Sequence, residues 1–197
     1  MKVILASSSP RRQQLMKQMG LCFEVVPSTI DEDICAPGLF RVPSRLAVER
    51  ARCKALDVSS KITGEALIVG ADTIVVLGEE ILGKPADAQE AEKMLKKLSG
   101  AVHTVITGLA VVRLPGLEEQ VAFSDTKVSF RHLQEDEIQN YIRSGEPLDK
   151  AGAYGIQGKG ALMVRWVNGC FFNVMGLPIG LLGEMLEKLG LNVFQGW

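Results

Sequence analysis

Two adjacent arginines, Arg11 and Arg12, follow three serines and a proline near the N-terminus. Ser9 is a favourable N-cap and Pro10 suits the first helical position, so we expect a helix to begin here. Cations in a first helical turn oppose the helix dipole by about 0.3 to 1 kcal/mol each, and a bound anion would remove that conflict. Free N–H groups, the hydroxyls of Ser7 and Ser9 and two guanidinium groups would together bind phosphate. The alternative is that both arginines bend away into solvent.

The second candidate for chemistry is Asp72, which follows the apolar run 66–70. Such a run is typical of a strand buried on both faces, and open α/β sheets bind ligands at the carboxyl ends of their strands. Partial burial would make Asp72 a useful general base, whereas the alternative is a residue that only caps a turn. Glu32, in the acidic segment 31–33, could join Asp72 in binding Mg²⁺ or Mn²⁺. The alternative for that segment is a solvated loop.

Other polar side chains would suit a nucleotide. Arg50 and Lys54 are four residues apart in a segment with helical composition, so they share one face. Gln157 lies among glycines, and its amide offers a donor and an acceptor to the edge of a base. Phosphate-binding cations, metal-binding carboxylates and a base-reading amide are the components of a nucleotide phosphohydrolase.

Lys84 invites a different interpretation, because the sequence from Gly78 to Lys84 imitates the start of a Walker A motif. Pro85 stands where that motif has its Mg²⁺-binding serine or threonine, and the context is a hairpin rather than a strand followed by a helix. We therefore reject a P-loop. A lysine before a proline has a restricted backbone and a long reach, so Lys84 could still point at a ligand; the alternative is a solvated lysine in a turn.

The elements that must position these residues mix strands and helices. Apolar runs bounded by turn residues predict strands at 3–5, 22–26, 66–70, 74–77, 81–82, 103–114 and 119–130, and two more after the glycine-rich segment 151–160. Apolar residues at helical spacing predict helices from Ser9 onward, at 44–59, after the capping residue Asp87, around 138–142 and at 181–189. Residues 27–43 are expected to form a long loop. The fold class is thus α/β, with a mixed, twisted central sheet and flanking helices.

The composition restricts the class of partner. The chain has 197 residues, of which 47% are hydrophobic, enough for one substantial domain or for two lobes that share a sheet. Its formal net charge of −1 argues against a broad nucleic-acid surface and favours a small anion. The mostly apolar segment 160–183 is interrupted by Arg165 and Pro178, so we expect buried strands and a helix there and no membrane partner.

Cysteine usage and the N-terminal residues bear on the compartment. The four cysteines form no C-x-x-C pair and the two histidines lie far apart in sequence, which argues against a zinc site. Scattered reduced thiols fit a reducing compartment. The apolar run after Lys2 is much shorter than the core of a signal peptide, so export is not indicated. We therefore expect a cytoplasmic protein.

Taken in order, these motifs resemble those of the Maf family of nucleoside triphosphate pyrophosphatases over nearly the whole chain. The matching segments are 5–12 (LASSSPRR), 70–73 (GADT), 83–85 (GKP), 98–100 (LSG) with His103, 145–158 (GEPLDKAGAYGIQG) and 173–178 (NVMGLP). The resemblance implies a single domain over 1–197, with two lobes around a cleft, related to inosine triphosphate pyrophosphatases. It also implies frequent homodimers.

The resemblance implies an activity as well: hydrolysis of a nucleoside triphosphate between the α and β phosphates, with a divalent metal, as part of the removal of unwanted nucleotides from the pool. Asp72 would be the proton acceptor, and Glu32 and Asp72 would hold the metal. The branch that acts on dTTP and UTP is marked by four residues that this chain carries, namely Arg11, Thr73, Lys84 and Gln157. Arg12 is then left with the phosphates.

The sequence leaves two alternatives. The helical lysine of the family falls on Arg50 when it is counted from Leu46-Ala47, but on Lys54 when it is counted back from Asp72. The family is also linked to septum formation and cell division, so the alternative function is a nucleotide-binding regulator with little turnover. A pure binding protein would have no need of Asp72 beside Glu32.

Overall fold

The computed structural model describes residues 1–35, 38 and 41–195, apart from the side chains of Glu32 and Asp33. The chain forms two compact units. Unit 1 consists of Met1–Asp72, Thr107–Ser124 and Gly176–Trp197, and unit 2 of Thr73–Ile106 and Asp125–Met175. No helix within the described ranges is long and apolar enough to cross a membrane.

The strands form a seven-stranded mixed sheet in the order β2-β1-β3-β5-β6-β7, with β4 paired to β3. The strands are β1 (Lys2–Leu5), β2 (Glu24–Val25), β3 (Ala66–Leu77), β4 (Glu80–Leu82), β5 (Val102–Leu114), β6 (Glu118–Phe130) and β7 (Val164–Gly169). Strand β1 is parallel to β2 and to β3, whereas β4 is antiparallel to β3 and β7 to β6. The predicted mixed sheet is confirmed.

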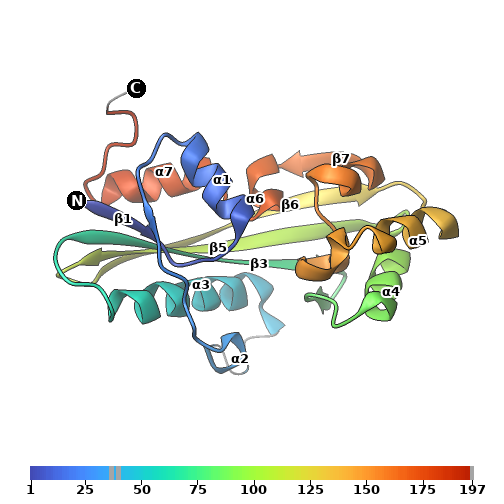
Figure 1. Cartoon of the computed structure of the whole chain (residues 1–197), viewed down its shortest axis with the longest axis horizontal. Helices are drawn as coiled ribbons and strands as arrows, with labels where there is room; N and C mark the ends of the chain where they lie inside the picture. Colours follow the sequence, from blue (N-terminus) through green and yellow to red (C-terminus); the bar gives the residue numbers. More distant parts are fainter. Residues whose placement is uncertain (36–37, 39–40, 196–197) are drawn as a thin grey trace. The chain divides into compact units, whose positions relative to one another are not determined.

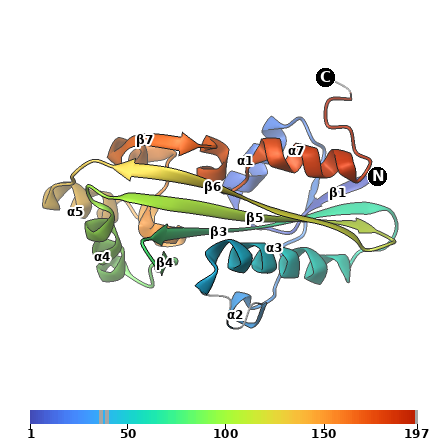
Figure 2. The same ribbon diagram turned by 180° about the vertical axis from the view of Figure 1, so that it is seen from behind.

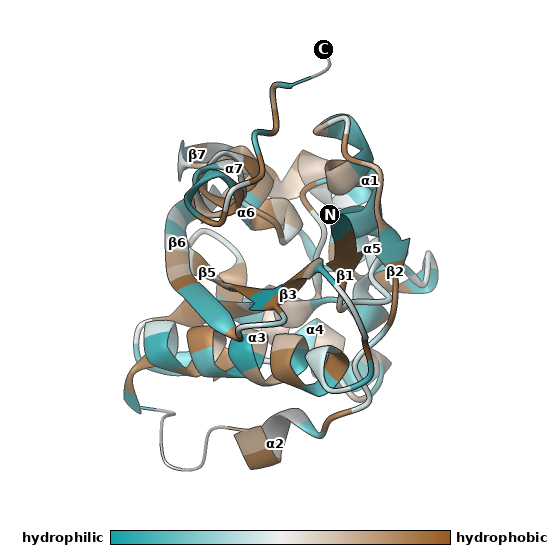
Figure 3. Ribbon diagram, turned by 90° about the vertical axis from the view of Figure 1, so that its left-hand side faces the viewer, coloured by the Kyte–Doolittle hydropathy of each residue, from teal (hydrophilic) through white to brown (hydrophobic). Residues whose placement is uncertain are grey.

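In unit 1, helices cover both faces of the strands. Figures 1 and 2 show α1 (Pro10–Gln18) and α7 (Ile179–Lys188) on one face and α3 (Pro43–Ser59) on the other. Viewed end-on in Figure 3, the hydrophobic strands lie between these two helix layers. The core beneath α3 consists of buried apolar residues, among them Ile4, Ala51, Ala55, Ile68 and Ala110.

Unit 2 carries α4 (Ala88–Leu98) and α5 (Glu135–Arg143), which pack against each other, and α6 (Phe171–Met175). Three short 3₁₀ helices follow α5 in the chain: η2 (Glu146–Asp149), η3 (Ala151–Ala153) and η4 (Gly158–Met163). The predicted cap of α4 is confirmed, since Asp87 Oδ1 accepts a hydrogen bond of 2.8 Å from the Glu90 N–H.

Three expectations about the elements were wrong. Segments 66–70 and 74–77 belong to one continuous strand, β3, so no turn separates them. The loop 27–43 contains a short helix, α2 (Glu32–Cys35). The second strand expected after the glycine-rich segment is instead helix α6, because a short apolar run does not by its pattern distinguish a buried strand from a helix.

Candidate active site

The centre of the site in unit 1 is a buried ion pair between α3 and β3. Lys54 Nζ donates to Asp72 Oδ1 at 2.7 Å, and the two side chains retain only 11% and 7% of their exposed surface. Asp72 Oδ2 is also buried and has no hydrogen-bond partner within the described part of the chain. One oxygen of this carboxylate is therefore fixed by a cation, whereas the other is buried without a hydrogen bond to any described residue.

A glycine sets the distance between the two elements that carry this pair. A Cβ atom on Gly70 would lie 2.1 Å from the Ala51 carbonyl oxygen and 3.0 Å from the Ala55 Cβ of α3. Only glycine therefore lets α3 pack this closely against β3. Lys54 lies between these two alanines in the helix, so the same contact brings its ammonium group to Asp72.

Asp72 does not follow the end of a strand, which corrects the sequence-based expectation, because β3 continues to Leu77. The position still suits a ligand because the neighbouring strand, β1, is shorter than β3. Strand β1 pairs with β3 only up to Leu5 opposite Val69, and one further hydrogen bond joins the Ala6 N–H to the Val69 carbonyl. Asp72 thus lies beyond the carboxyl end of β1, on the side where the loop leading to α1 begins.

That loop holds Arg12 in a defined position. Arg12 Nη1 donates to Ser7 Oγ at 3.1 Å, and Arg12 Nε donates to the Gly176 carbonyl at 2.9 Å. Ser7 is 8% exposed, and its Oγ also accepts from the Ser9 N–H at 3.3 Å. Arg12 therefore does not simply extend into solvent, which was one of the two alternatives.

Helix α1 begins as the sequence indicates, with Ser9 as its N-cap and Pro10 in the first turn. No side chain within the described ranges caps this helix by a hydrogen bond, and no acidic residue occupies its first turn. Arg11, in that turn, is half-buried. The helix start consequently keeps N–H groups and positive charge at one place, as an anion site requires.

The remaining unit 1 candidates are Arg50 and Glu32. Arg50 is half-buried on α3, one turn before Lys54, whose ammonium group pairs with Asp72. Glu32 opens α2, and its side chain lies outside the described part of the structure. No three His, Cys, Asp or Glu side chains among those described come together as a metal cluster.

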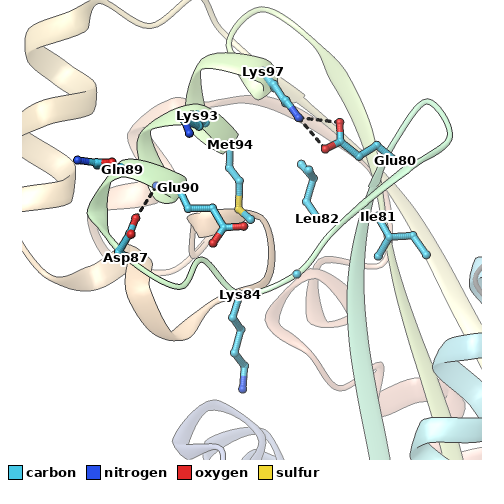
Figure 4. Close-up of a pocket in the computed structure, with 11 residues that line it drawn as sticks. Glu80, Ile81, Leu82, Lys84, Asp87, Gln89, Glu90, Lys93, Met94 and Lys97 are labelled. Atoms are coloured by element: carbon cyan, nitrogen blue, oxygen red, sulfur yellow. Dashed lines mark hydrogen bonds and ion pairs between the residues drawn. The ribbon is translucent and has the colours of Figure 1, made fainter. Parts of the chain in front are cut away.

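Two unit 2 candidates lie on and after β3. Thr73 is half-buried within the strand, and Lys84 is exposed just after β4. Lys84 lines a surface pocket of about 430 Å³ together with residues of β4 and α4. In Figure 4 its side chain extends away from Glu90 and Met94, so the lysine reaches out from the pocket wall instead of filling the pocket.

The third unit 2 candidate, Gln157, is half-buried and immediately precedes η4. The backbone around it is held by side chains that sequence reasoning did not single out. Glu146 accepts hydrogen bonds from the N–H groups of Lys159 and Gly160, and Tyr141 Oη accepts one from the Gly155 N–H. Glu146 is within the 145–158 motif, but only the fold shows what it binds.

His103 is also part of unit 2, where it belongs to a buried aromatic group. Its ring lies edge-on to Phe130 and Tyr154, with centroid distances of 5.1 and 5.3 Å, and His103 Nε2 shares a 2.8 Å hydrogen bond with Tyr154 Oη. Burial lowers the pKa of His103 from 6.5 to about 4 and raises the pKa of Tyr154. His103 is therefore a neutral core residue.

Comparison with known proteins places the chain. A dTTP/UTP pyrophosphatase of Ruminiclostridium cellulolyticum is 46% identical over 193 residues, covering 98% of each chain, and one of Alkaliphilus oremlandii is 50% identical over 191 residues, covering 95% of each. A crystal structure of a nucleoside-triphosphatase / dITP/XTP pyrophosphatase from Mycobacterium abscessus is 16% identical, covers 97% of this chain and 99% of that one, and has a TM-score of 0.44. The family model described as Maf-like protein matches residues 2–189, so the chain belongs to the Maf family.

Proposed function

We propose that the protein hydrolyses pyrimidine nucleoside triphosphates, dTTP and UTP in particular, to the monophosphate and pyrophosphate. The observation that carries the proposal is Asp72, a buried carboxylate with one oxygen bound by Lys54 and the other without a hydrogen-bond partner in the described ranges. The relatives named dTTP/UTP pyrophosphatase support the substrate class, since they match at 46% and 50% identity over nearly the whole chain.

Asp72 is the general base of the proposed reaction. Its Oδ2 takes a proton from a water molecule whose oxygen attacks the α-phosphorus, while the bond from that phosphorus to the bridging oxygen breaks and pyrophosphate leaves. Lys54 holds Oδ1 during this step, so the carboxylate does not have to reorient. A positioned base of this kind contributes a factor of about 10² to 10⁴ to the rate.

The cations are proposed to neutralise the triphosphate as charge moves to the leaving group. Arg12 is already oriented by Ser7 and the Gly176 carbonyl, which lowers the cost of ordering its long side chain. Arg11 and Lys84 are assigned to the same anion. Either Arg50 or Lys54 completes this group of phosphate-binding cations. If it is Lys54, its ammonium group has to contact the phosphate while it still donates to Asp72.

We assign recognition of the pyrimidine base of the nucleotide to Thr73 and Gln157. A glutamine amide can donate to a keto oxygen and accept from a ring N–H, and uracil and thymine present this pair of groups. Cytosine presents an amino group and an unprotonated nitrogen at the same positions. Gln157 would therefore favour UTP and dTTP over CTP.

A divalent cation, Mg²⁺ or Mn²⁺, fits the proposed site. Asp72 Oδ2 is a buried oxygen without a hydrogen-bond partner in the described ranges, and Mg²⁺ sites usually combine one or two carboxylates with substrate phosphates. We assign Asp72 and Glu32 to it. Asp72 Oδ2 has two lone-pair sites, so it could face the cation with one and take the proton of the attacking water with the other. When bound, the cation would polarise the phosphoryl oxygens.

A nucleotide-binding regulator of cell division with little turnover is the less favoured alternative, because binding alone needs no buried carboxylate with an available oxygen. From the family resemblance we also propose a homodimer, and from the composition and cysteine usage a cytoplasmic protein that binds neither nucleic acid nor membranes.

The test is a panel of triphosphates, dTTP, UTP, CTP and ATP, assayed separately for pyrophosphate and orthophosphate with and without Mg²⁺. We expect pyrophosphate and monophosphate in equal amounts, fastest from dTTP and UTP, and only in the presence of the metal. Release of orthophosphate from UTP would refute the assigned bond cleavage. Tight binding of UTP without any product would instead support the regulator.

A further inference from the structure

The carboxylate of Glu146 binds the backbone on the C-terminal side of Gln157. Glu146 Oε2 accepts from the Lys159 N–H at 3.2 Å, and Oε1 accepts from the Gly160 N–H at 3.3 Å. Glu146 lies in η2, 13 and 14 residues before these two amides in the chain, and is half-buried. A single side chain thus fixes two consecutive amides of the start of η4.

The hydroxyl of Tyr141 binds the backbone on the N-terminal side of Gln157. Tyr141 Oη accepts from the Gly155 N–H at 3.1 Å and donates to Glu146 Oε1 at 3.1 Å. Tyr141 is 4% exposed on α5, and burial raises its pKa, so the phenol keeps its proton and remains a donor to the carboxylate. Tyr141 and Glu146 therefore hold both ends of the segment 155–160 through one connected set of hydrogen bonds.

The glycines of this segment are required by these contacts. A Cβ atom on Gly160 would lie 2.2 Å from the Gly155 carbonyl oxygen and 2.8 Å from Tyr141 Oη, and one on Gly158 would lie 3.0 Å from Glu146 Oε2. Gly158 also has a φ of +77°, in the left-handed region that favours glycine. At Gly158 and Gly160 the glycines thus let the backbone approach the Glu146–Tyr141 pair.

We propose that Glu146 and Tyr141 are positioning residues that hold Gln157 in place for discrimination between pyrimidine bases, an inference that rests on the proposed function. Glycine has the largest backbone freedom to lose on folding, so a segment with glycines at 155, 158 and 160 would place Gln157 poorly by itself. Selection by hydrogen bonds to a base depends on the donor and the acceptor being fixed in advance. Glu146 and Tyr141, which we call the clamp, fix the segment with a carboxylate and a buried phenol.

The test compares UTP with CTP, which carry the same ribose and triphosphate and differ only at the base edge. We expect Glu146→Gln and Tyr141→Phe each to reduce the ratio of kcat/KM for UTP to kcat/KM for CTP by about tenfold, mainly by lowering kcat/KM for UTP. The double variant should lose little more than either single one, because both act on one segment. Glu137→Gln is the matched control: its carboxylate pairs with Arg131 in the same unit and is not bonded to segment 155–160.

The ratio separates positioning from stability, because a loss of folded enzyme lowers both rates equally. An unchanged ratio in Glu146→Gln, while Gln157→Ala abolishes the preference, would overturn the proposal and leave the hydrolysis standing. A wild-type enzyme that releases no pyrophosphate would refute the proposed function. The clamp itself is then decided by deuterium uptake of peptides covering 155–160, which must rise in both variants and stay at the wild-type level in Glu137→Gln.

Discussion

Lys54 and Asp72 form a buried pair, with Nζ 2.7 Å from Oδ1, in which the second carboxylate oxygen has no hydrogen-bond partner among the described residues. A buried carboxylate normally uses both oxygens, since each one without a partner costs about 1 to 3 kcal/mol. The oxygen without a partner therefore destabilises the folded protein, and a bound water or metal ion would remove that free-energy cost. This asymmetry makes Asp72 the leading candidate for the base.

Asp72→Asn should abolish pyrophosphate release. Asparagine keeps an oxygen that accepts from Lys54 but cannot take a proton from water, so we expect kcat to fall by about 10³-fold or more. The measurement is pyrophosphate release from UTP at saturating substrate. Asp57→Asn is the control, because Asp57, in α3, is also paired with a lysine, Lys61 at 2.9 Å, and should keep nearly full activity. Substantial activity in Asp72→Asn would show that another group is the base.

Lys54→Met should destabilise the fold and slow the reaction, since it leaves the Asp72 carboxylate buried without the lysine that pairs with it. Breaking a buried pair in this way costs about 3 to 5 kcal/mol. The double variant Lys54→Met/Asp72→Asn should recover part of that loss, which urea denaturation of the four proteins measures as a coupling energy. Strictly additive losses would mean that the two side chains are not coupled in solution.

Ser7→Ala should weaken substrate binding more than it weakens the fold. It removes the hydroxyl that accepts from Arg12 Nη1, so the guanidinium group is held by fewer contacts when it meets the triphosphate. We expect kcat/KM for UTP to fall by about tenfold, close to the value of one hydrogen bond to a charged group. Ser8→Ala, next to it and exposed, is the control and should behave as the wild type. Equal effects of both substitutions would argue against an oriented Arg12.

Local sequence signals predicted most of the fold, because they act within single elements. The apolar residues at helical spacing and the Asp87 cap of α4 are both local signals, and the structure confirms the helix. The continuous strand β3 was missed, since Asp72 and Thr73 resemble turn residues when they are considered alone. What keeps them extended is tertiary packing, which a local pattern does not contain.

The site was predictable as a set of residue types but not as a set of contacts. The spacing of Arg50 and Lys54 put them on one face, yet it could not decide which one reaches Asp72. That contact depends on the approach of α3 to β3, which Gly70 permits. The clamp of Glu146 on the backbone around Gln157 joins segments more than ten residues apart, and nothing in its spacing signals it.

His103 should make the fold sensitive to acid. Burial lowers its pKa to about 4 in the folded protein, against 6.5 when it is exposed. Above pH 6.5 the ring is neutral in the folded and the unfolded state, and the contribution of His103 to the free energy of unfolding is fully present. Between pH 6.5 and 4 only the unfolded state gains the proton, so the free energy of unfolding falls as the pH falls, by up to about 3 kcal/mol. The measurement is the free energy of unfolding in urea at about pH 7 and about pH 4.5.

The substitution His103→Gln isolates this contribution from that of the carboxylates. Glutamine does not titrate, so the variant should be less stable than the wild type near neutral pH but lose less stability on acidification. His132→Gln, at an exposed position outside the buried aromatic group, is the matched control for a histidine-to-glutamine change. If His103→Gln instead loses as much stability between the two pH values as the wild type does, His103 is protonated in the folded protein, and the aromatic group around it must be open to water.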